Sequence, residues 1–563
     1  MKTSILWSHV MWTLSIIMFT WSMLLTMNLK TMIMEWDILS MGTSNISLPI
    51  IMDPMGTMFS AVVLFISANV IHFSDYYMQD ELFIKRFTHL VLFFILSMNM
   101  LIFLPHLMAL LLGWDGLGIT SFILVIYYQN PKSLAAGMIT ALTNRIGDVM
   151  LLLTIGWSLN QGHWLITNMW NSNFSMAMCT TITLAAMTKS AQMPFSSWLP
   201  AAMAAPTPVS ALVHSSTLVT AGVFLTIRFY PMLSKFFLFN TSLLMISTLT
   251  MFMAGMSALV ETDLKKIIAL STLSQLGVMM ASISLNLPNL AFFHLITHAM
   301  FKALLFICAG SLIHLHHHSQ DLRSMGNTTN QMPLTMACLL TANMALCGLP
   351  FMAGFYSKDM IIEMCLFNQS NTTIVIMLIL ATLMTAAYSS RLMSTALVSN
   401  NMSLPIQYSS DNTLANTTPM LILSVGAICS GSLMNWLFIS PLKEPLLSSE
   451  MKLIPLMVTI LGATSMFNKS TSKAPTPNNS MFSHMNALMW FLVPLSSQAL
   501  LKLPMSVCLK SMYTLDQGWT ELSSAQGIHS TSSNMAKSLQ TTQIPLMTIH
   551  LSLMVMFILF TIM

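Results

Sequence analysis

Apolar segments long enough to cross a lipid bilayer follow one another along the whole chain, separated by short polar stretches. A transmembrane helix needs about 20 apolar residues. Segments that approach this length lie at 1–29, 57–73, 88–104, 106–128, 136–158, 174–192, 208–229, 236–260, 266–285, 289–313, 332–349, 371–392, 418–438, 451–466, 484–503 and 543–563. The pattern predicts an all-α polytopic membrane protein with about 15 to 16 transmembrane helices, the first of them an uncleaved span. Residues 31–55 are too acidic for a span and are expected to form a loop.

Composition supports this class and excludes several others. Of the 563 residues, 55% are hydrophobic and only 7% are charged, whereas soluble domains carry about 25% charged residues. So few polar groups cannot cover a water-exposed surface, and no sizeable soluble domain fits between the apolar segments. Because the net charge is only +4 and no basic run occurs, nucleic acid is not an expected partner. Membrane lipids are expected partners.

The sequence contains no pattern that predicts a bound cofactor or metal. Its seven cysteines are scattered and form no CxxC pair, which argues against iron–sulfur clusters and structural zinc. Neither GxGxxG nor GxxxxGK[ST], the common nucleotide-binding motifs, occurs. Four histidines cluster at 314 and 316–318, but they follow the end of an apolar segment, so a wetted loop is favoured over a metal site. These features argue against a self-contained redox enzyme or ATPase.

Methionine is unusually frequent, at 57 of the 563 residues. Met is adaptable apolar filler, which explains why so many are tolerated but not why they are so abundant. A mitochondrial genetic code that reads an isoleucine codon as methionine would produce the excess. The composition therefore points towards a mitochondrially encoded chain.

Two apolar segments are interrupted by proline or glycine beside a lysine. One interruption begins at Lys189 and includes Pro194, and the other runs from Gly348 to Asp359 and includes Lys358. Proline removes a helical hydrogen bond, and at membrane depth the freed backbone groups must face protein or water. Paired broken helices in the two halves of a transporter mark an ion path. A pair of ordinary proline kinks is the alternative.

Titratable residues also lie inside apolar segments, where a charge costs about 3 kcal/mol on insertion scales. His294, His298 and Lys302 recur at i, i+4 and i+8, so they line one face of one helix. A lone membrane histidine is more often a helix contact than a relay, but a series of such groups across a bundle predicts a proton wire. The expected members of this wire, drawn from several apolar segments, are Asp115, Lys189, His294, His298, Lys302 and Lys358.

Four further charged residues lie in or beside the apolar segments. Arg145 and Asp148 are spaced i, i+3 and are expected to form a structural ion pair. Lys265 and Lys266 open the helix before the histidine stripe. They belong either to the wire or to the membrane interface, where lysines extend towards water.

These residues lie in motifs that resemble a known family. The motifs are GWDGLG at 113–118, NRIGD at 144–148, KSAQMP at 189–194, PTPVSALVH at 206–214, TDLKK at 262–266, FHLITHAMFKALLF at 293–306 and GFYSKD at 354–359. From about Asp53 to Arg391 the chain resembles subunit 5 of NADH:ubiquinone oxidoreductase (respiratory complex I), a family of antiporter-like membrane subunits. The resemblance implies two inverted five-helix repeats with one broken helix each. It also implies a place in the mitochondrial inner membrane beside the other membrane-arm subunits, especially the neighbouring antiporter-like ones.

The resemblance implies that this chain moves protons while NADH is oxidised by ubiquinone elsewhere in the complex. Asp115 would be the acidic partner of Lys189, and Lys358, beside Asp359, would be the exit-side group. The central polar axis would consist of His214, Lys265 or Lys266, His294, His298 and Lys302. NADH, FMN, iron–sulfur clusters and ubiquinone would all lie on other subunits. The chain departs from the family at Asp115, where Glu is usual, and in having one clear span before residue 57 where two are common.

The implied organisation divides the chain into six parts. They are 1–87 (N-terminal spans), 88–260 (first antiporter-like half), 261–395 (core of the second half), 396–503 (additional spans), 504–541 (lateral amphipathic helix) and 542–563 (terminal transmembrane anchor). For 504–541, which is too polar to span, a plain extramembrane loop is the alternative.

Other functions remain open at the level of sequence. The large subunit of a stand-alone multisubunit cation/proton antiporter would share the core motifs. A purely structural membrane anchor would have no need of the buried charges. A polytopic enzyme acting on lipid would need a nucleophile with a base, or a metal cluster, and the sequence offers neither.

Overall fold

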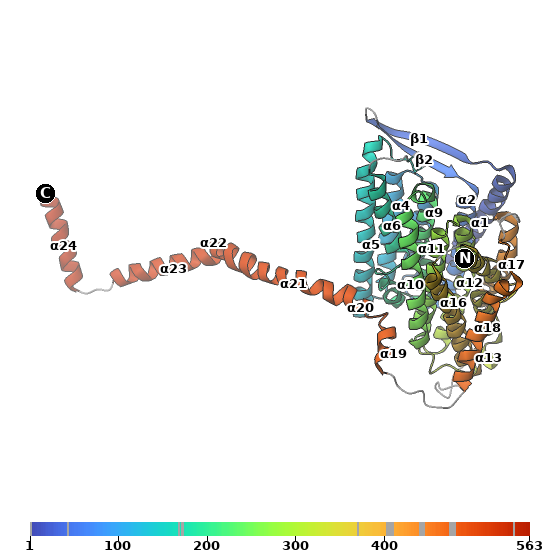
Figure 1. Cartoon of the computed structure of the whole chain (residues 1–563). Helices are drawn as coiled ribbons and strands as arrows, with labels where there is room; N and C mark the ends of the chain where they lie inside the picture. Colours follow the sequence, from blue (N-terminus) through green and yellow to red (C-terminus); the bar gives the residue numbers. More distant parts are fainter. Residues whose placement is uncertain are drawn as a thin grey trace. The chain divides into compact units, whose positions relative to one another are not determined.

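The structure is a computed structural model that describes residues 3–41, 44–166, 169, 174–368, 371–400, 410–411, 413–438, 445–471, 480–543 and 547–563. The chain forms two compact units, Met1–Val493 and Pro494–Met563. The first unit is a bundle of long helices with one β-hairpin (Figure 1).

The elements of the first unit follow in chain order. They are α1 (Thr3–Asn28), β1 (Met32–Met41), β2 (Ser44–Met52), α2 (Pro54–Tyr77), α3 (Ile84–Phe103), α4 (Leu107–Val125), α5 (Pro131–Ser158), η1 (Leu159–Gln161), α6 (Ser175–Lys189), α7 (Trp198–Ala201), η3 (Ala202–Ala204), α8 (Thr207–Val209), η4 (Ser210–Thr217), α9 (Leu218–Leu233), α10 (Phe237–Val260), α11 (Leu264–Ser284), α12 (Pro288–Leu315), α13 (Thr328–Gln331), α14 (Pro333–Cys347), η5 (Phe355–Asp359), α15 (Met360–Phe367), α16 (Thr372–Met393), η6 (Ser394–Val398), α17 (Leu414–Phe438), α18 (Ser449–Thr471) and α19 (Ser480–Ala487).

The predicted all-α polytopic class is confirmed. Within the described residues, 13 helices are long and apolar enough to cross a membrane, or 14 if the bent pair α23 (Ala525–Thr542) and α24 (Met547–Ile562) counts as one span. The total of about 15 to 16 expected from hydropathy is higher because it includes 174–192 and 332–349 as full spans. They form α6 and α14, which have 15 residues each and stop at the two interruptions.

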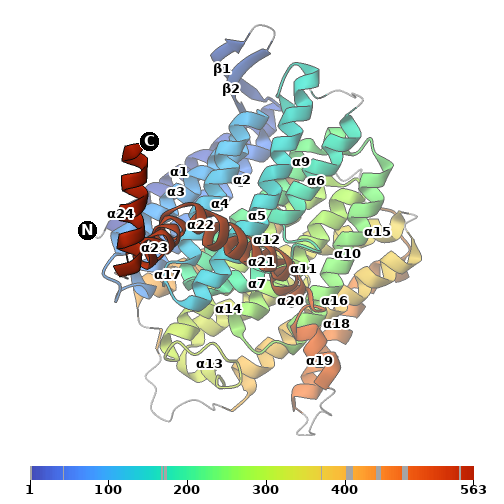
Figure 2. The same cartoon turned by 90° about the vertical axis from the view of Figure 1, so that its left-hand side faces the viewer.

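Strands β1 and β2 pair as an antiparallel hairpin, in place of the loop expected for 31–55. Met32 pairs with Met52 and Trp36 with Leu48, and the register shifts between Asp37 and Leu39. Glu35 and Asp37 prevent this stretch from spanning a bilayer, but cross-strand pairing still satisfies its backbone. The hairpin projects from one end of the bundle (Figures 1 and 2).

Helices α2, α9, α11 and α12 form the interior of the bundle. The apolar parts of α9 and α11 are completely buried, and those of α2 and α12 nearly so. Peripheral helices instead expose large apolar side chains, such as Ile16 on α1, Leu152 on α5 and Met457 on α18. In a membrane such side chains face lipid or neighbouring apolar helices, so the interior helices are the ones able to hold polar groups away from lipid.

An ion pair fixes the start of α2. Asp53 caps this helix by accepting a hydrogen bond from the Gly56 N–H at 3.1 Å. The Arg228 guanidinium, near the end of α9, donates to both Asp53 oxygens at 2.6 and 2.8 Å and also to the Ile102 carbonyl. This bidentate pair joins α2, α3 and α9 at the hairpin end of the bundle.

Helices α2, α12 and α16 end at the opposite end of the bundle, which we call the polar end. Leu264, which begins α11, donates its N–H to the Gln320 carbonyl in the loop after α12. Arg391 near the end of α16 donates to the carbonyls of Leu259 and Glu261. Burial raises the pKa of the Glu261 carboxyl, and the nearby Lys266 ammonium opposes this shift only in part.

The second unit is helical almost throughout. After α20 (Leu492–Pro494) come η8 (Leu495–Ala499), α21 (Leu500–Ser511), η9 (Met512–Thr520), α22 (Glu521–Ser523), α23 (Ala525–Thr542) and α24 (Met547–Ile562). Most of 504–541 is therefore helical, with an irregular backbone at Ser524.

This helix starts earlier than the sequence indicated, and 484–503 is not one span. A turn follows α19, closed by the Trp490 N–H donating to the Met485 carbonyl, and residues 489–491 have positive φ angles. The long helix then starts at Leu492, so the apolar residues 492–503 belong to it and not to the helix that contains His484; the stretch Leu492–Ser523 is itself one of the 13 helices apolar enough to span.

Candidate functional site

The first interruption places a lysine at the end of a helix inside the bundle. Helix α6 ends at Lys189, and the chain then turns through Ser190–Ser197 before α7. Gly222 on α9 allows this approach, because a Cβ there would lie 3.0 Å from the Ser190 nitrogen and closer still to the Ala186 carbonyl. Lys189 is completely buried.

Lys189 is held by Trp114, not by a carboxylate. Its ammonium donates to the Trp114 carbonyl at 3.3 Å and lies 4.8 Å from the centre of the indole ring. The same indole donates its Nε1–H to the Asp148 carboxylate at 2.7 Å. Asp148 is 8% exposed, so this charge-assisted bond is largely shielded from the surroundings.

Asp115 and Arg145 lie at the edge of this cluster. Arg145 Nη1 is 3.2 Å from the Asp148 carboxylate and 3.9 Å from that of Asp115. The side chains of Asp115 and Arg145 are 41% and 58% exposed, although each lies near the middle of its spanning helix. Asp115 is electrostatically coupled to Lys189, as is Asp148, but it makes no direct ion pair with Lys189 among the described residues.

The second interruption has the same ingredients. Helix α14 ends at Cys347, Gly348 follows with a φ of 83°, and the chain re-enters a π-helical turn, η5. Gly354 must be glycine, because a Cβ there would overlap the Ala345 carbonyl. The turn buries Lys358, whose ammonium donates to the Thr385 hydroxyl on α16 at 2.8 Å. Asp359 is 9% exposed and interacts electrostatically with Lys358.

His294 connects the central helices to the second interruption. Its Nδ1 lies 2.9 Å from the Ser357 hydroxyl and its Nε2 lies 3.2 Å from the Gln275 side-chain oxygen on α11. The Thr297 hydroxyl is 3.1 Å from the same Ser357 oxygen. The imidazole therefore bridges α11 and η5 through both ring nitrogens.

The rest of the histidine stripe lies along α12. Lys302 is completely buried and donates to the Ser271 hydroxyl on α11. The His298 ring centre is 6.3 Å from that of His294, and both its nitrogens are buried without a hydrogen bond to the described part of the protein. The contact between His294 and Ser357 joins the stripe to the second interruption, and Lys302 also interacts electrostatically with Lys358.

The sequence did not single out the polar groups that surround this stripe. Ser271, Ser274 and Gln275 lie at i, i+3 and i+4 on α11, and Tyr388 on α16 is 3.3 Å from the Ser274 hydroxyl. Their pattern was available in the sequence, because three polar residues recur on one face of an otherwise apolar helix. Thr385 and Ser357 carried no comparable signal, since hydroxyl residues are common in membrane helices.

Lys265 and His214 lie near the first interruption. Lys265 is 4% exposed and donates to the Ala205 carbonyl at 3.1 Å. Its neighbour Lys266 turns outward and pairs with Asp263 at 3.0 Å, which distinguishes the two lysines that the sequence left equivalent. His214 lies in η4, buried beside Trp198, and neither ring nitrogen has a hydrogen-bond partner among the described residues.

The buried lysines share one property. Lys189, Lys265, Lys302 and Lys358 each donate to a carbonyl or a hydroxyl, and in the described part of the chain none lies within 4 Å of a carboxylate. A neutral partner offsets only a small part of the free-energy cost of burying an ammonium group. These sites can therefore exchange a proton without breaking a direct ion pair. No direct polar contact joins Lys189 to the stripe within the described residues.

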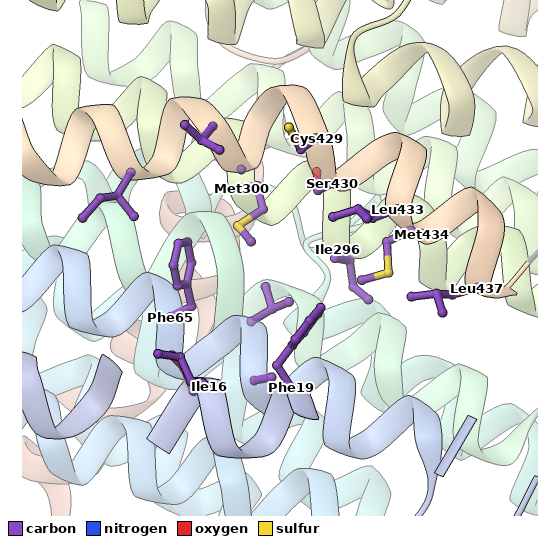
Figure 3. A pocket seen from close by; sticks show the side chains of 16 residues that line it. Ile16, Phe19, Phe65, Ile296, Met300, Cys429, Ser430, Leu433, Met434 and Leu437 are labelled. Carbon is purple, nitrogen blue, oxygen red and sulfur yellow. The ribbon is translucent and has the colours of Figure 1, made fainter. Parts of the chain in front are cut away.

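An apolar groove lies outside this network. It has a volume of about 520 Å³ and is lined by α1, α2, α12 and α17, including Phe19, Phe65, Met300 and Leu433 (Figure 3). The face of α12 that lines it carries Ile296 and Met300, not the titratable stripe.

In the described ranges, no group of three or more His, Cys, Asp or Glu residues is arranged so that it could hold a metal ion.

Three sequence families match successive parts of the chain. Residues 36–88 match the N-terminus of chain 5 of NADH-ubiquinone oxidoreductase (complex I), 105–385 the transmembrane family of NADH:quinone oxidoreductase and Mrp antiporters, and 388–563 the C-terminus of NADH dehydrogenase subunit 5. Together they span both interruptions and the second unit.

Individual relatives agree with these families. NADH-ubiquinone oxidoreductase chain 5 of Lumbricus terrestris is 55% identical over 540 residues, covering 94% of this chain and 93% of the relative. Its counterpart from Anopheles gambiae is 48% identical over 515 residues, covering 90% and 88%. Among solved structures, an Mrp complex from Dietzia sp. DQ12-45-1b shares the fold, with a TM-score of 0.69 at 23% identity. The match covers 86% of this chain and 57% of that one.

Proposed function

The chain belongs to the family of NADH-ubiquinone oxidoreductase chain 5, and from this premise we propose that its buried lysines and histidines carry protons across the membrane during NADH oxidation. The protein is a multi-pass subunit of a multisubunit membrane complex. The likeness to the Mrp structure shows a shared fold. The alternative function, that of a subunit of a stand-alone antiporter, is supported only in so far as such proteins are relatives of this chain.

The observation that carries the proposal is the set of four buried lysines with neutral partners. A purely structural anchor gains nothing from burying four ammonium groups, each of which costs several kcal/mol. A proton carrier needs this arrangement, since the lysine must release its proton and recover it. The neighbouring carboxylates of Asp115 and Asp359 act through space and favour the protonated state without locking it.

The relay has two ends and a central stripe. Lys189, influenced by Asp115 and Asp148, forms one end, and Lys358 beside Asp359 forms the other. His294 accepts or donates through Ser357 and Gln275, and histidine changes charge near neutral pH. His214, Lys265, His298 and Lys302 supply the intermediate sites. Asp148 holds the Trp114 indole in place and forms a structural ion pair with Arg145.

The exposure of Asp115 and Arg145 supports a neighbouring membrane subunit at this face. Their side chains lie at mid-span and are surrounded by exposed apolar residues such as Leu112 and Leu142. A charged side chain facing lipid at this depth is costly. Another polytopic subunit of complex I, of the antiporter-like type, would cover the pair. The mitochondrial inner membrane is the location that follows for such a complex, and the frequency of methionine agrees with it.

Redox chemistry belongs elsewhere in this proposal. NADH, FMN, iron–sulfur clusters and ubiquinone would be bound by other subunits, as the family resemblance implies; the sequence has neither the nucleotide-binding motifs nor the cysteine pairs typical of dinucleotide and iron–sulfur sites. The chain would therefore affect how many protons move for each NADH, not the chemistry of the electron transfer itself.

The test replaces Lys189 or Lys358 by Met in the assembled complex. Methionine keeps most of the bulk and removes the proton site. We expect fewer protons pumped per NADH oxidised, measured with a pH-sensitive dye in sealed vesicles, while NADH oxidation by an artificial acceptor is unchanged. Lys266→Met is the matched control, because that lysine is half-exposed and paired with Asp263. Normal pumping in both Lys189→Met and Lys358→Met complexes would overturn the proposal.

A further inference from the structure

A pocket lies at the polar end of the bundle, where α2 ends, α3 begins and α4 ends. Its volume is about 410 Å³, and small-ligand sites usually have about 300 to 1,000 Å³. The lining includes Glu81 from the loop after α2, Arg86 from the first turn of α3, and Tyr127 and Tyr128, which follow α4. The pocket is separate from the proposed proton relay and shares no residue with it.

The two charged side chains of this pocket are not paired with each other. Among the described residues, neither Glu81 nor Arg86 lies within 4 Å of an opposite charge. Arg86 is exposed and Glu81 is partly exposed, so both can reach a ligand. A pocket lined by an unpaired cation and an unpaired anion is complementary to a ligand that carries both charges.

Aromatic rings form the wall that suits a positive group. The buried Phe87 ring meets the Tyr127 ring edge to face, with 5.6 Å between their centres, and this packing holds Tyr127 in place. The Tyr128 ring centre is 5.8 Å from that of Tyr127. Because the faces of tyrosine rings attract ammonium groups, these rings and the Glu81 carboxylate favour the cationic part of a ligand.

The apolar part of the pocket lies deeper in the membrane than the charged part. Leu90 also lines the pocket and is one turn beyond Arg86, about 6 Å further along α3. Arg86, Leu90 and Phe93 are spaced i, i+4 and i+7, so they share one face of this helix. Phe93 is 59% exposed. Charged groups at the membrane boundary above an apolar face match the division of a phospholipid into headgroup and chains.

We propose that this pocket binds the headgroup of a zwitterionic phospholipid such as phosphatidylethanolamine. The Arg86 guanidinium would donate two parallel hydrogen bonds to the phosphate, and the Glu81 carboxylate would accept from the ammonium group. The acyl chains would lie along Leu90 and Phe93. The inference goes beyond the proposed relay and does not depend on it. A soluble phosphodiester such as glycerophosphoethanolamine shares the headgroup chemistry but has no chains for the apolar face.

The test asks which lipid contacts the pocket in the assembled complex. The complex is placed in bilayers with a trace of photoactivatable phosphatidylethanolamine or, in a second sample, of photoactivatable phosphatidylglycerol with the same chains. After illumination, cross-links to 81–93 and 122–129 are quantified as a share of all labelling on this chain. The zwitterionic probe should label these peptides about fivefold more than the anionic one, because only its ammonium can pair with Glu81.

The same comparison can overturn the proposal without any variant. Equal or stronger labelling by phosphatidylglycerol would show that the pocket does not recognise the ammonium group. Absence of labelling by both probes would show that another subunit occupies the pocket. An excess of soluble glycerophosphoethanolamine should leave the labelling unchanged, and displacement of the probe would overturn the assignment to a lipid.

Neighbouring residues of the same charge provide matched controls. Arg86→Gln should lower labelling by both probes about fivefold, whereas Lys85→Gln, which removes an exposed cation outside the pocket lining, should not. Glu81→Gln should abolish the preference for the zwitterionic probe, whereas Asp80→Asn should keep it. The amount of assembled complex identifies variants that fail to fold. Equal effects of Arg86→Gln and Lys85→Gln would indicate general attraction of lipid by surface charge and would overturn the site.

Discussion

Neutralising Asp115 should impair proton pumping at almost no cost to the fold. Its closest charged partner is Arg145 at 3.9 Å, and both side chains are more than one-third exposed in the isolated chain. A pair this long and this exposed contributes at most about 1 kcal/mol in the isolated chain. Where a neighbouring subunit covers the pair, Arg145 still keeps its closer partner Asp148, at 3.2 Å, so no charge is left unpaired. Asp115→Asn should therefore leave assembly intact and remove one of the two carboxylates that act on the buried Lys189.

Asp148 supplies the contrast. It accepts the Trp114 indole N–H at 2.7 Å and is largely buried, and a hydrogen bond to a charged group is worth about 1.5 to 3 kcal/mol. Asp148→Ala should thus destabilise the protein by about that amount, whereas Asp115→Ala should not.

The assay for both sites compares heat resistance of the assembled complex with protons pumped per NADH. We expect Asp115→Asn to lower only pumping and Asp148→Ala to lower both. Asp115→Glu, which restores the residue usual in the family, should pump normally. Full pumping by a fully assembled Asp115→Asn complex would remove Asp115 from the relay. A larger stability loss at Asp115 than at Asp148 would refute the structural reasoning.

Two further predictions concern the scaffold. Truncation after about residue 500 should loosen the distal part of the membrane arm before NADH oxidation is lost. The reason is that α21 to α23 expose Leu509, Leu515 and Leu522, which need a partner surface. Cross-links that place 504–541 in solvent, away from every other subunit, would contradict this prediction. Arg228→Met breaks a mostly buried ion pair with Asp53, which should lower the free energy of unfolding by about 3 kcal/mol and so reduce the yield and heat resistance of the complex. Arg323→Met removes only an exposed pair with Asp321 and should change neither.

The sequence predicted the interior of the bundle better than its edges. Apolar segments located the spanning helices, and proline and glycine beside lysines located both interruptions, because those signals are local. Residues 32–52 were missed because a short hairpin is stabilised by cross-strand pairing that no single segment reveals. The turn at 489–491 was missed for a related reason: hydropathy does not report a backbone bond such as that from Trp490 to Met485.

The candidate site was predictable as a set of residues but not as a set of partners. Hydropathy singled out Lys189 and Asp115, yet the structure interposes Trp114 and Asp148 at the lysine. Which of two adjacent lysines turns inward depends on the rotation of α11, and sequence alone could not separate Lys265 from Lys266.

The most direct test of the account is proton pumping by two variants of Lys302, which is completely buried and bonded to the Ser271 hydroxyl. Lys302→Met removes the charge and the proton, whereas Lys302→Arg keeps a charge but holds its proton permanently. If this site exchanges protons, both variants should pump fewer protons per NADH than the unmodified complex while keeping NADH oxidation by an artificial acceptor. Normal pumping by an assembled Lys302→Arg complex would show that a fixed charge suffices there, and would contradict the claim that the buried lysines carry protons.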